Sequence, residues 1–154
     1  MSQTARMATV RVSHAGLCVA DLAASLRFYT EGLGFEVAEG YDVGDEVADT
    51  LEVPHGVELR SQMIVKDGTK IELLGWTSPS THGTPSQTRN QLGLTHLSFE
   101  VEDLPAVEAA LVSLGATVIE STRTHIDMGV ATLDLLFLAD PDGTRIELME
   151  TITR

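Results

Sequence analysis

The feature that most constrains the fold of this chain is an internal repeat. The stretch "SHAGLCVADL" near the start and the stretch "THLSFEVEDL" in the second half share a histidine that is followed seven residues later by an Asp-Leu pair. Each continues into a helix-like segment that ends near Leu-Gly, and each half closes on an "IEL" stretch that follows an Asp-Gly turn signal. Landmarks that recur in the same order indicate a duplicated structural unit.

Each half follows the order strand, helix, strand, strand, strand. In the first half, a strand over Val10–Ala20 leads to Asp21, a residue type that favours a helix N-cap, and to a helix over Leu22–Glu31. Asp103 holds the same place in the second half, where Pro105 falls in the first helical turn. Further strands are expected near Phe35–Tyr41, Val57–Val65, Thr69–Trp76, Thr117–Thr122, Ala131–Ala139 and Thr144–Glu150. The pattern predicts an α+β fold of two tandem βαβββ modules.

Both modules fit into one domain. The chain has 154 residues, the length of an ordinary single domain. We expect module one at residues 10–76, a linker rich in Ser, Thr and Pro at 77–92, and module two at 93–150.

Charge and composition exclude several classes of function. The formal net charge is −13 and the ten basic residues form no cluster, so we expect neither nucleic acid nor a membrane surface as a partner. No apolar run approaches the roughly 18 residues of a membrane-spanning helix, and the start "MSQTARMATVRVSH" lacks an apolar stretch of signal-peptide length. Cys18 is the only cysteine, which fits a cytoplasmic protein. A single arginine can still hold a small anion, and the candidates are Arg60, Arg89 and Arg123.

Four side chains point to the same kind of face in the two modules. Along "LTHLSFEV" the apolar residues alternate with His96, and His14 alternates with apolar neighbours in the same way. In the closing strands, Glu72 and Glu147 point away from the side that faces the helices. The residues expected to pack against the helices are Ile71, Leu73, Ile146 and Leu148. Each module therefore presents one histidine and one glutamate on the concave side of its sheet.

The repeated pairs predict a metal site. Two neutral imidazoles and two carboxylates suit one divalent first-row ion, and Zn, Ni, Co, Mn and Fe all remain open. The argument rests on the duplication, because solvation of a polar side chain does not require the other half to repeat it. His55 and His82 fall in turn-rich stretches and His125 in a connection before a strand, so we assign them no ligand role.

On these features the chain resembles the vicinal oxygen chelate superfamily, which includes glyoxalase I, methylmalonyl-CoA epimerase, extradiol dioxygenases and the fosfomycin and bleomycin resistance proteins. "FYTEGLGF" and "DPDGTRIELME" match it closely, and the resemblance extends from about Val10 to Glu150. It implies that the modules form a cup-shaped mixed sheet and that the metal ligands are His14, Glu72, His96 and Glu147. It also implies a homodimer, because members commonly dimerise and some build the metal site across two chains.

Glyoxalase I and methylmalonyl-CoA epimerase are the members most similar to this chain. The resemblance implies a lyase or isomerase whose metal chelates two neighbouring oxygens of a small substrate while a carboxylate removes a proton next to the carbonyl. Glu147 is the first candidate for that base and Glu72 the second. Tyr41–Pro54 has no clear counterpart and is expected to form part of the substrate wall. A further acid could come from Glu46, Glu52 or Glu58.

Other functions stay open at this point. An extradiol-type dioxygenase binds Fe(II) with two histidines and one glutamate, so a fourth ligand at Glu72 argues against it. A thiol transferase of the fosfomycin-resistance type usually has one glutamate rather than two. A metal-free drug-binding protein of the bleomycin-resistance type typically lacks the full ligand set, which this chain retains.

Overall fold

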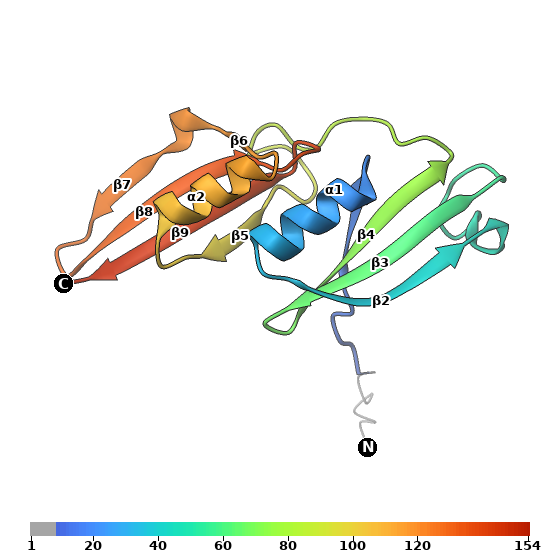
Figure 1. Cartoon of the computed structure of the whole chain (residues 1–154), viewed down its shortest axis with the longest axis horizontal. Helices are drawn as coiled ribbons and strands as arrows, with labels where there is room; N and C mark the ends of the chain where they lie inside the picture. Colours follow the sequence, from blue (N-terminus) through green and yellow to red (C-terminus); the bar gives the residue numbers. More distant parts are fainter. Residues whose placement is uncertain (1–8) are drawn as a thin grey trace, which may run out of the picture.

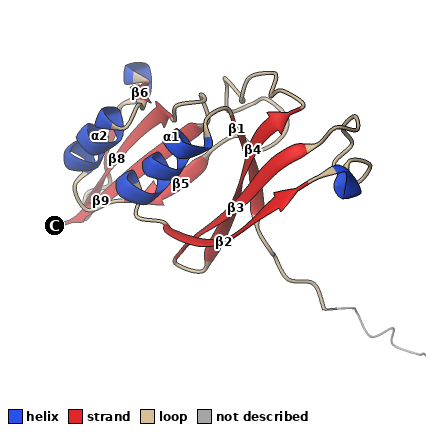
Figure 2. Ribbon diagram, turned by 45° about the vertical axis from the view of Figure 1, so that its right-hand side comes forward, coloured by secondary structure: helices blue, strands red, loops and turns tan. Residues whose placement is uncertain are grey.

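The computed structural model describes residues 9–154, which form two β-sheets and two α-helices (Figures 1 and 2). In Figure 1 the first sheet occupies the right of the view and the second sheet the left, and helix α1 lies between them. The first eight residues of the stretch in which we expect no signal peptide lie outside the described residues. Between residues 9 and 154, no helix has the length and apolar character that crossing a membrane would require.

The first sheet contains the four strands of the first half of the chain. Its order is β1-β4-β3-β2, with β1 parallel to β4 and the other neighbours antiparallel. The strands are β1 (Ala15–Val19), β2 (Glu36–Val43), β3 (Glu58–Lys66) and β4 (Thr69–Ser78). A parallel pair requires a long crossover, and the helical segment that follows β1 begins that crossover.

The second sheet repeats this arrangement. Its order is β5-β9-β8-β6, β5 is parallel to β9, and β7 adds to β8. The strands are β5 (Leu97–Glu100), β6 (Thr117–Val118), β7 (Thr124–Asp127), β8 (Ala131–Ala139) and β9 (Arg145–Thr153). The predicted α+β fold with two βαβββ modules is confirmed, and within the described chain the strands form two separate sheets.

Both helices begin where the sequence predicts. The backbone N–H of Ala24 donates to Asp21 Oδ1 at 3.0 Å at the start of α1 (Leu22–Arg27), which continues as a π-helical turn, η1 (Phe28–Gly32). At the start of α2 (Leu104–Ser113), the N–H of Ala106 donates to Asp103 Oδ1 at 3.0 Å. These bonds satisfy N–H groups that would otherwise lack partners within the helix.

The two modules share one hydrophobic core. Leu73, Ile146 and Leu148 have no exposed surface and Ile71 has 2%, so the four residues predicted to face the helices do so. Gly32 lies where the helical segments of the two modules meet, and a Cβ there would approach Leu111 Cδ2 to 2.7 Å. A side chain at this position would displace the buried Leu111 side chain, so a glycine suits this close approach.

Polar contacts also join the modules. The Tyr29 hydroxyl of the first module donates to Asp140 Oδ2 of the second at 2.9 Å, and both residues are buried. Burial raises the pKa of the Asp140 carboxyl, although the Tyr29 bond and the N–H groups of Thr144 and Asp142 act in the opposite direction. The N–H of Ala20 donates to Asp142 Oδ2 at 3.1 Å. A satisfied polar contact therefore lies inside the seam between the modules.

Several strand boundaries differ from those predicted. The first strand begins at Ala15 rather than Val10, because its pairing with β4 starts there, with Ala15 opposite Ile71, and β5 likewise begins just after His96. The predicted strand over Thr117–Thr122 pairs for two residues and then forms a 3-10 turn, η3 (Glu120–Thr122). Strand β7 was not predicted, since its charged and polar sequence "THID" lacks an apolar face.

Candidate metal centre

In the first module, β1 and β4 bring a histidine and a glutamate together. The parallel register sets Gly16 opposite Glu72, and His14 lies two residues before Gly16. As a result, His14 Nε2 lies 3.2 Å from Glu72 Oε2, with 32% and 20% of the two side chains exposed.

The second module contains an equivalent pair. The register of β5 and β9 sets Ser98 opposite Glu147, and His96 lies two residues before Ser98. His96 Nε2 lies 3.5 Å from Glu147 Oε2. Both pairs therefore have the same offset from the parallel register, so the sequence repeat places the same two groups at the same point of each module.

The spacing within each pair fits two ligands of one metal ion. Bonds of about 2.0–2.2 Å to an imidazole nitrogen and a carboxylate oxygen separate those two atoms by roughly 3.0–3.5 Å in octahedral or tetrahedral geometry. Each pair supplies one nitrogen and one oxygen at such a separation, 3.2 Å in one and 3.5 Å in the other. Each is half of the predicted ligand set.

The two half-sites do not meet within one chain. Among residues 9–154, no group of three or more His, Cys, Asp and Glu side chains lies close enough to hold a metal ion. The modules contact each other through their helices and the core behind the sheets, so the half-sites remain on separate sheets. One chain thus offers two separate pairs rather than one site of four ligands.

A hydroxyl group orients each imidazole. Ser13 Oγ lies 3.0 Å from His14 Nδ1, and Thr95 Oγ1 lies 2.8 Å from His96 Nδ1. An engaged Nδ1 directs Nε2 toward the glutamate, and an Nδ1–H that donates to the hydroxyl leaves the Nε2 lone pair available for a metal. We did not predict these hydroxyl groups, although the repeated "SH" and "TH" dipeptides carry the signal.

The two glutamates differ in how firmly they are held. The Ser61 hydroxyl donates to Glu72 Oε1 at 2.5 Å. The register of β3 with β4 places Ser61 opposite Leu74, and the equivalent position in the second module is Leu135, opposite Met149. Leucine cannot donate a hydrogen bond, and in the described part of the chain the Glu147 carboxylate accepts none, its one polar contact being His96 Nε2 at 3.5 Å. Glu147 is therefore the carboxylate with more freedom to move.

The segment that follows β2 covers part of the first module's face. Ala48, Leu51 and Val53 pack in a small cluster that includes Leu74 and Trp76 of β4, the strand that carries Glu72. The segment predicted to form part of a substrate wall, Tyr41–Pro54, thus packs against the strand that carries Glu72. The three glutamates left open lie in or next to it, and one of them, Glu46, accepts a bond from the N–H of Gly44 at 3.0 Å.

His96 also lines a cavity between the modules. This cavity has a volume of about 530 Å³, and its walls come from β1, the linker and the start of β9. His82 of the linker lines it as well, whereas His55 and His125 lie beside Asp45 and Asp134 in exposed positions. The half-site of the second module therefore opens onto a space large enough for a small molecule.

A family model and individual relatives match this chain over most of its length. The model of the glyoxalase/bleomycin resistance protein/dioxygenase superfamily matches residues 11–148. An ethylmalonyl-CoA/methylmalonyl-CoA epimerase from Cereibacter sphaeroides is 33% identical over 144 residues, which cover 90% of this chain and 96% of the epimerase. A protein named a probable lactoylglutathione lyase from Vibrio parahaemolyticus is 29% identical over 147 residues, with 94% of this chain and 93% of the relative covered.

Solved structures share the fold. A glyoxalase family protein from Bacillus cereus superimposes with a TM-score of 0.80 over 97% of this chain and 99% of its own, at 20% identity. A domain from Frankia sp., described as a glyoxylase/bleomycin resistance protein/dioxygenase domain, has a TM-score of 0.58 at 25% identity, with 96% of this chain and 94% of the other covered.

Proposed function

Because this chain belongs to the glyoxalase/bleomycin resistance protein/dioxygenase superfamily, we propose that it is a divalent-metal-dependent lyase or isomerase that moves a proton next to a carbonyl group. His14, Glu72, His96 and Glu147 are its metal ligands. The observation that carries the proposal is the repetition of the His–Glu pair at the same register in both modules.

The complete site consists of half-sites from two copies of the chain. Strands β1 and β5, which follow the two histidines, are each the terminal strand of their sheet, and so each leaves one edge for another strand. Large apolar side chains close to both histidines are strongly exposed: Val12 is 97% exposed and Leu94 is 62% exposed. A second copy that covers these residues would remove apolar surface from water and bring His14 and Glu72 of one chain to the other pair.

His14, Glu72, His96 and Glu147 would hold a divalent metal, which when bound would supply a Lewis acid for a substrate carbonyl and so acidify the neighbouring C–H bond. Glu147 takes the proton as general base, because its carboxylate is the less restrained of the two. Glu72, fixed by Ser61, stays in place as a ligand. Return of the proton to the neighbouring carbon gives a glyoxalase-type isomerisation, and return to the opposite face of the same carbon gives an epimerisation. Substrates of the two kinds are hemithioacetals and acyl-CoA thioesters.

Metal analysis of mixed dimers tests the ligand set and its distribution over two chains. His14→Ala and His96→Ala chains each lose one ligand from every site, so each alone should lose the metal that the parent binds. A dimer of one chain of each kind retains one intact site, because its unaltered half-sites face each other. The two chains are coexpressed with different histidine-free affinity tags, the mixed dimer is isolated, and its metal is measured by elemental mass spectrometry.

The control is His125→Ala, which removes an exposed imidazole that lies beside Asp134 and should retain the metal content of the parent. A mixed dimer without metal, made from a parent that binds it, would show that the ligands come from one chain. A parent that takes up none of Zn, Ni, Co, Mn and Fe(II) would overturn the proposed function.

A further inference from the structure

A second cavity lies in the second module, directly beside its half-site. It has a volume of about 450 Å³. Its apolar floor is formed by Leu135 and Phe137 of β8, and the register of β8 with β9 sets Phe137 opposite Glu147. The ring of Phe137 also meets the His96 imidazole edge to face, with 5.3 Å between centroids. The cavity therefore adjoins both residues of the half-site.

Two arginines line this cavity, and neither pairs with a carboxylate within residues 9–154. These are Arg89, from the end of the linker, and Arg145, the first residue of β9. Five other basic residues of the described chain form ion pairs, whereas Arg11 and Arg27, which lie outside this cavity, form none. The pairs are Arg60 with Asp42, Lys66 with Asp67, Lys70 with Glu39, Arg123 with Glu108 and Glu120, and Arg154 with Asp127. In a chain of net charge −13, Arg89 and Arg145 therefore bring two positive charges without acidic partners to one cavity.

Arg89 is held in place by the backbone. Its guanidinium donates to the carbonyl oxygen of Thr95 and, at 2.8 Å, to that of Ser86. It lies over the Phe137 ring at 5.4 Å from the centroid. Two of its five N–H groups are used in these bonds, so the others remain to bind a ligand. The linker is thus part of the wall of a cavity and not only a connection.

Arg145 is fixed in a similar way. It donates to the carbonyl oxygen of Gly143 at 2.9 Å and to Gln87 Oε1 at 3.2 Å. It lies two residues before Glu147 on β9 and therefore on the same face of the strand. Burial, and then the charge of Arg145, lower the pKa of Arg89. Two partly buried cations that repel each other would be stabilised by an anion bound between them.

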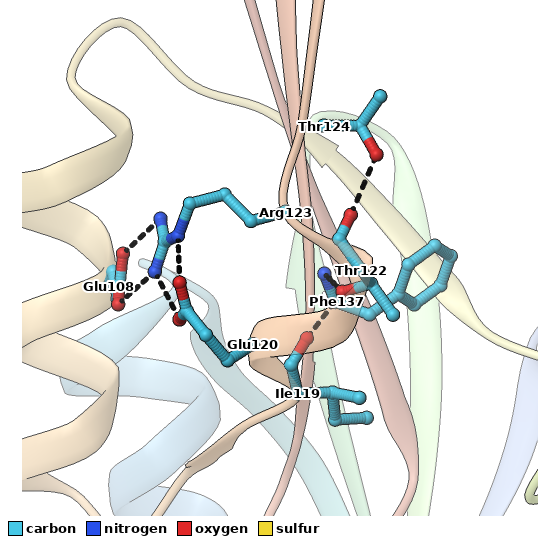
Figure 3. A network of polar contacts seen from close by, with 7 residues as sticks. All are labelled: Glu108, Ile119, Glu120, Thr122, Arg123, Thr124 and Phe137. Atoms are coloured by element: carbon cyan, nitrogen blue, oxygen red, sulfur yellow. Dashed lines mark hydrogen bonds and ion pairs between the residues drawn. The ribbon is translucent and has the colours of Figure 1, made fainter.

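Figure 3 shows a network of polar contacts around the turn that contains Ile119 and Thr122. Arg123 donates to both oxygens of Glu108 on α2, at 3.0 and 2.9 Å, and to both oxygens of Glu120. This fixes the turn in which Thr122 Oγ1 donates to the carbonyl oxygen of Ile119 at 2.7 Å and accepts from the N–H of Phe137 at 2.9 Å. Ile119 and Thr122 line the cavity. The wall is therefore preformed, as a ligand site requires.

We propose that this cavity is the subsite for an anionic group of the substrate, a phosphate or a carboxylate, which Arg89 and Arg145 bind with charge-assisted hydrogen bonds. Phe137 supplies the apolar surface between that anion and the reacting carbon at the half-site. That the anion belongs to the substrate rests on the proposed function. That the cavity binds an anion does not. Arg89 and Arg145 determine specificity; Arg89 is one of the three arginines that the sequence offered for binding an anion, and Arg145 adds a second.

Anion titrations followed by NMR test this subsite in the metal-free full chain. Inorganic phosphate and benzoate are added separately, with sodium chloride at equal ionic strength as the reference, and the Nε–H resonances of Arg89 and Arg145 are monitored. We expect saturable shifts of both resonances with at least one probe, and the probe that binds tells phosphate from carboxylate. Arg89→Gln should weaken that binding by about tenfold or more, because it removes charged hydrogen bonds.

Arg60→Gln is the matched control. Arg60 adjoins Ser61 on β3 and so points to the opposite face from the half-site, where it pairs with Asp42. The Arg60→Gln variant should bind the probe as tightly as the parent does. If Arg89→Gln unfolds, Arg145→Gln provides the same test, since its bonds are to loop atoms of Gly143 and Gln87. Equal shifts with chloride, or equal weakening in Arg60→Gln, would overturn the subsite.

The outcome is independent of the metal experiment. Saturable anion binding in a chain that takes up no metal would retain the subsite and reject the proposed function. Metal binding without a saturable anion shift would do the reverse.

Discussion

The two modules carry the same pair of side chains in different surroundings. In the first module, Ser61 restrains Glu72, and a cluster around Ala48 and Leu51 covers the face of the strand beside it. In the second, Glu147 has no such hydroxyl, and the half-site borders two cavities and two arginines. The repeat thus shows which features the site needs twice and which it needs once. Under the proposed function, a metal would need ligands from both modules, whereas a proton acceptor and an anion subsite would each be needed only once.

The largest expected difference between the modules is in turnover, when Glu72 and Glu147 are each replaced by glutamine in separate variants. Glutamine still offers an oxygen to a metal but cannot accept a proton. Glu147→Gln should therefore lower kcat by about 10²–10⁴-fold with its metal retained. Glu72→Gln should lower it much less, since the Glu72 carboxylate is already engaged by Ser61. Turnover is measured with metal-loaded protein on a hemithioacetal and on an acyl-CoA thioester, together with metal content.

A larger loss in Glu72→Gln than in Glu147→Gln would reverse the assignment of the base and show that the firmly held carboxylate is the reactive one. Ser61→Ala then separates the explanations, because it frees Glu72 without removing a carboxylate.

The next largest expected effect is on stability and concerns the buried hydrogen bond that joins the two modules. Tyr29→Phe removes the hydroxyl that donates to buried Asp140 across the seam. We expect a loss of about 1–3 kcal/mol in the free energy of unfolding at pH 7, because the carboxylate loses a partner that water cannot replace. Urea unfolding followed by circular dichroism measures it, and Tyr41→Phe, which changes an exposed tyrosine, is the control.

The same variant has a defined pH dependence. Burial raises the pKa of Asp140, so its ionisation costs stability as pH rises from the ordinary aspartate pKa of about 3.9 through the raised value. The Tyr29 hydroxyl lowers that pKa, and its removal raises it further. The loss in Tyr29→Phe should therefore be larger at pH 7 than at pH 4. An equal loss at both values would mean that the hydroxyl contributes packing rather than stabilisation of the charge.

Much of the fold could be predicted because it is periodic. Asp21 and Asp103 are N-cap residues that predict where the helices begin. The alternation of apolar and polar residues around Ile71 and Ile146 predicts which face of each closing strand is buried. The same alternation, together with the repeat, identified the four residues that form the two His–Glu pairs. These inferences use only neighbours along the chain and the geometry of helix and strand.

Features that depend on distant residues could not be predicted. Arg89 and Arg145 are 56 residues apart in the sequence (145 − 89). Nothing in their local sequence indicates that both line one cavity. The sequence also could not show that the pairs remain apart in one chain, because periodicity describes each module and not the distance between modules. Strand β7 was missed for a similar reason, since its pairing with β8 rather than an apolar pattern makes it a strand.

The smallest expected effect concerns the segment after β2 that covers part of the first module's face, which we call the cover. Asp45 Oδ1 accepts from the N–H groups of Gly56 and Val57, at 2.5 and 2.8 Å, and so joins the two ends of the covering segment. These bonds lower the pKa of Asp45, so the closure they provide is present above the ordinary aspartate value and is lost as pH falls through the lowered one. Asp45→Asn keeps an acceptor without its charge and should speed amide exchange at Gly56 and Val57 severalfold at neutral pH.

Hydrogen-exchange mass spectrometry measures this change, with the exposed Asp49→Asn in the same segment as the control. In the described chain the polar partners of Asp45 all belong to the first module, so exchange in β8 and β9 should stay as in the parent. If both modules exchanged faster, the cover would belong to the shared core, and the difference between an enclosed and an open half-site would lose its physical basis.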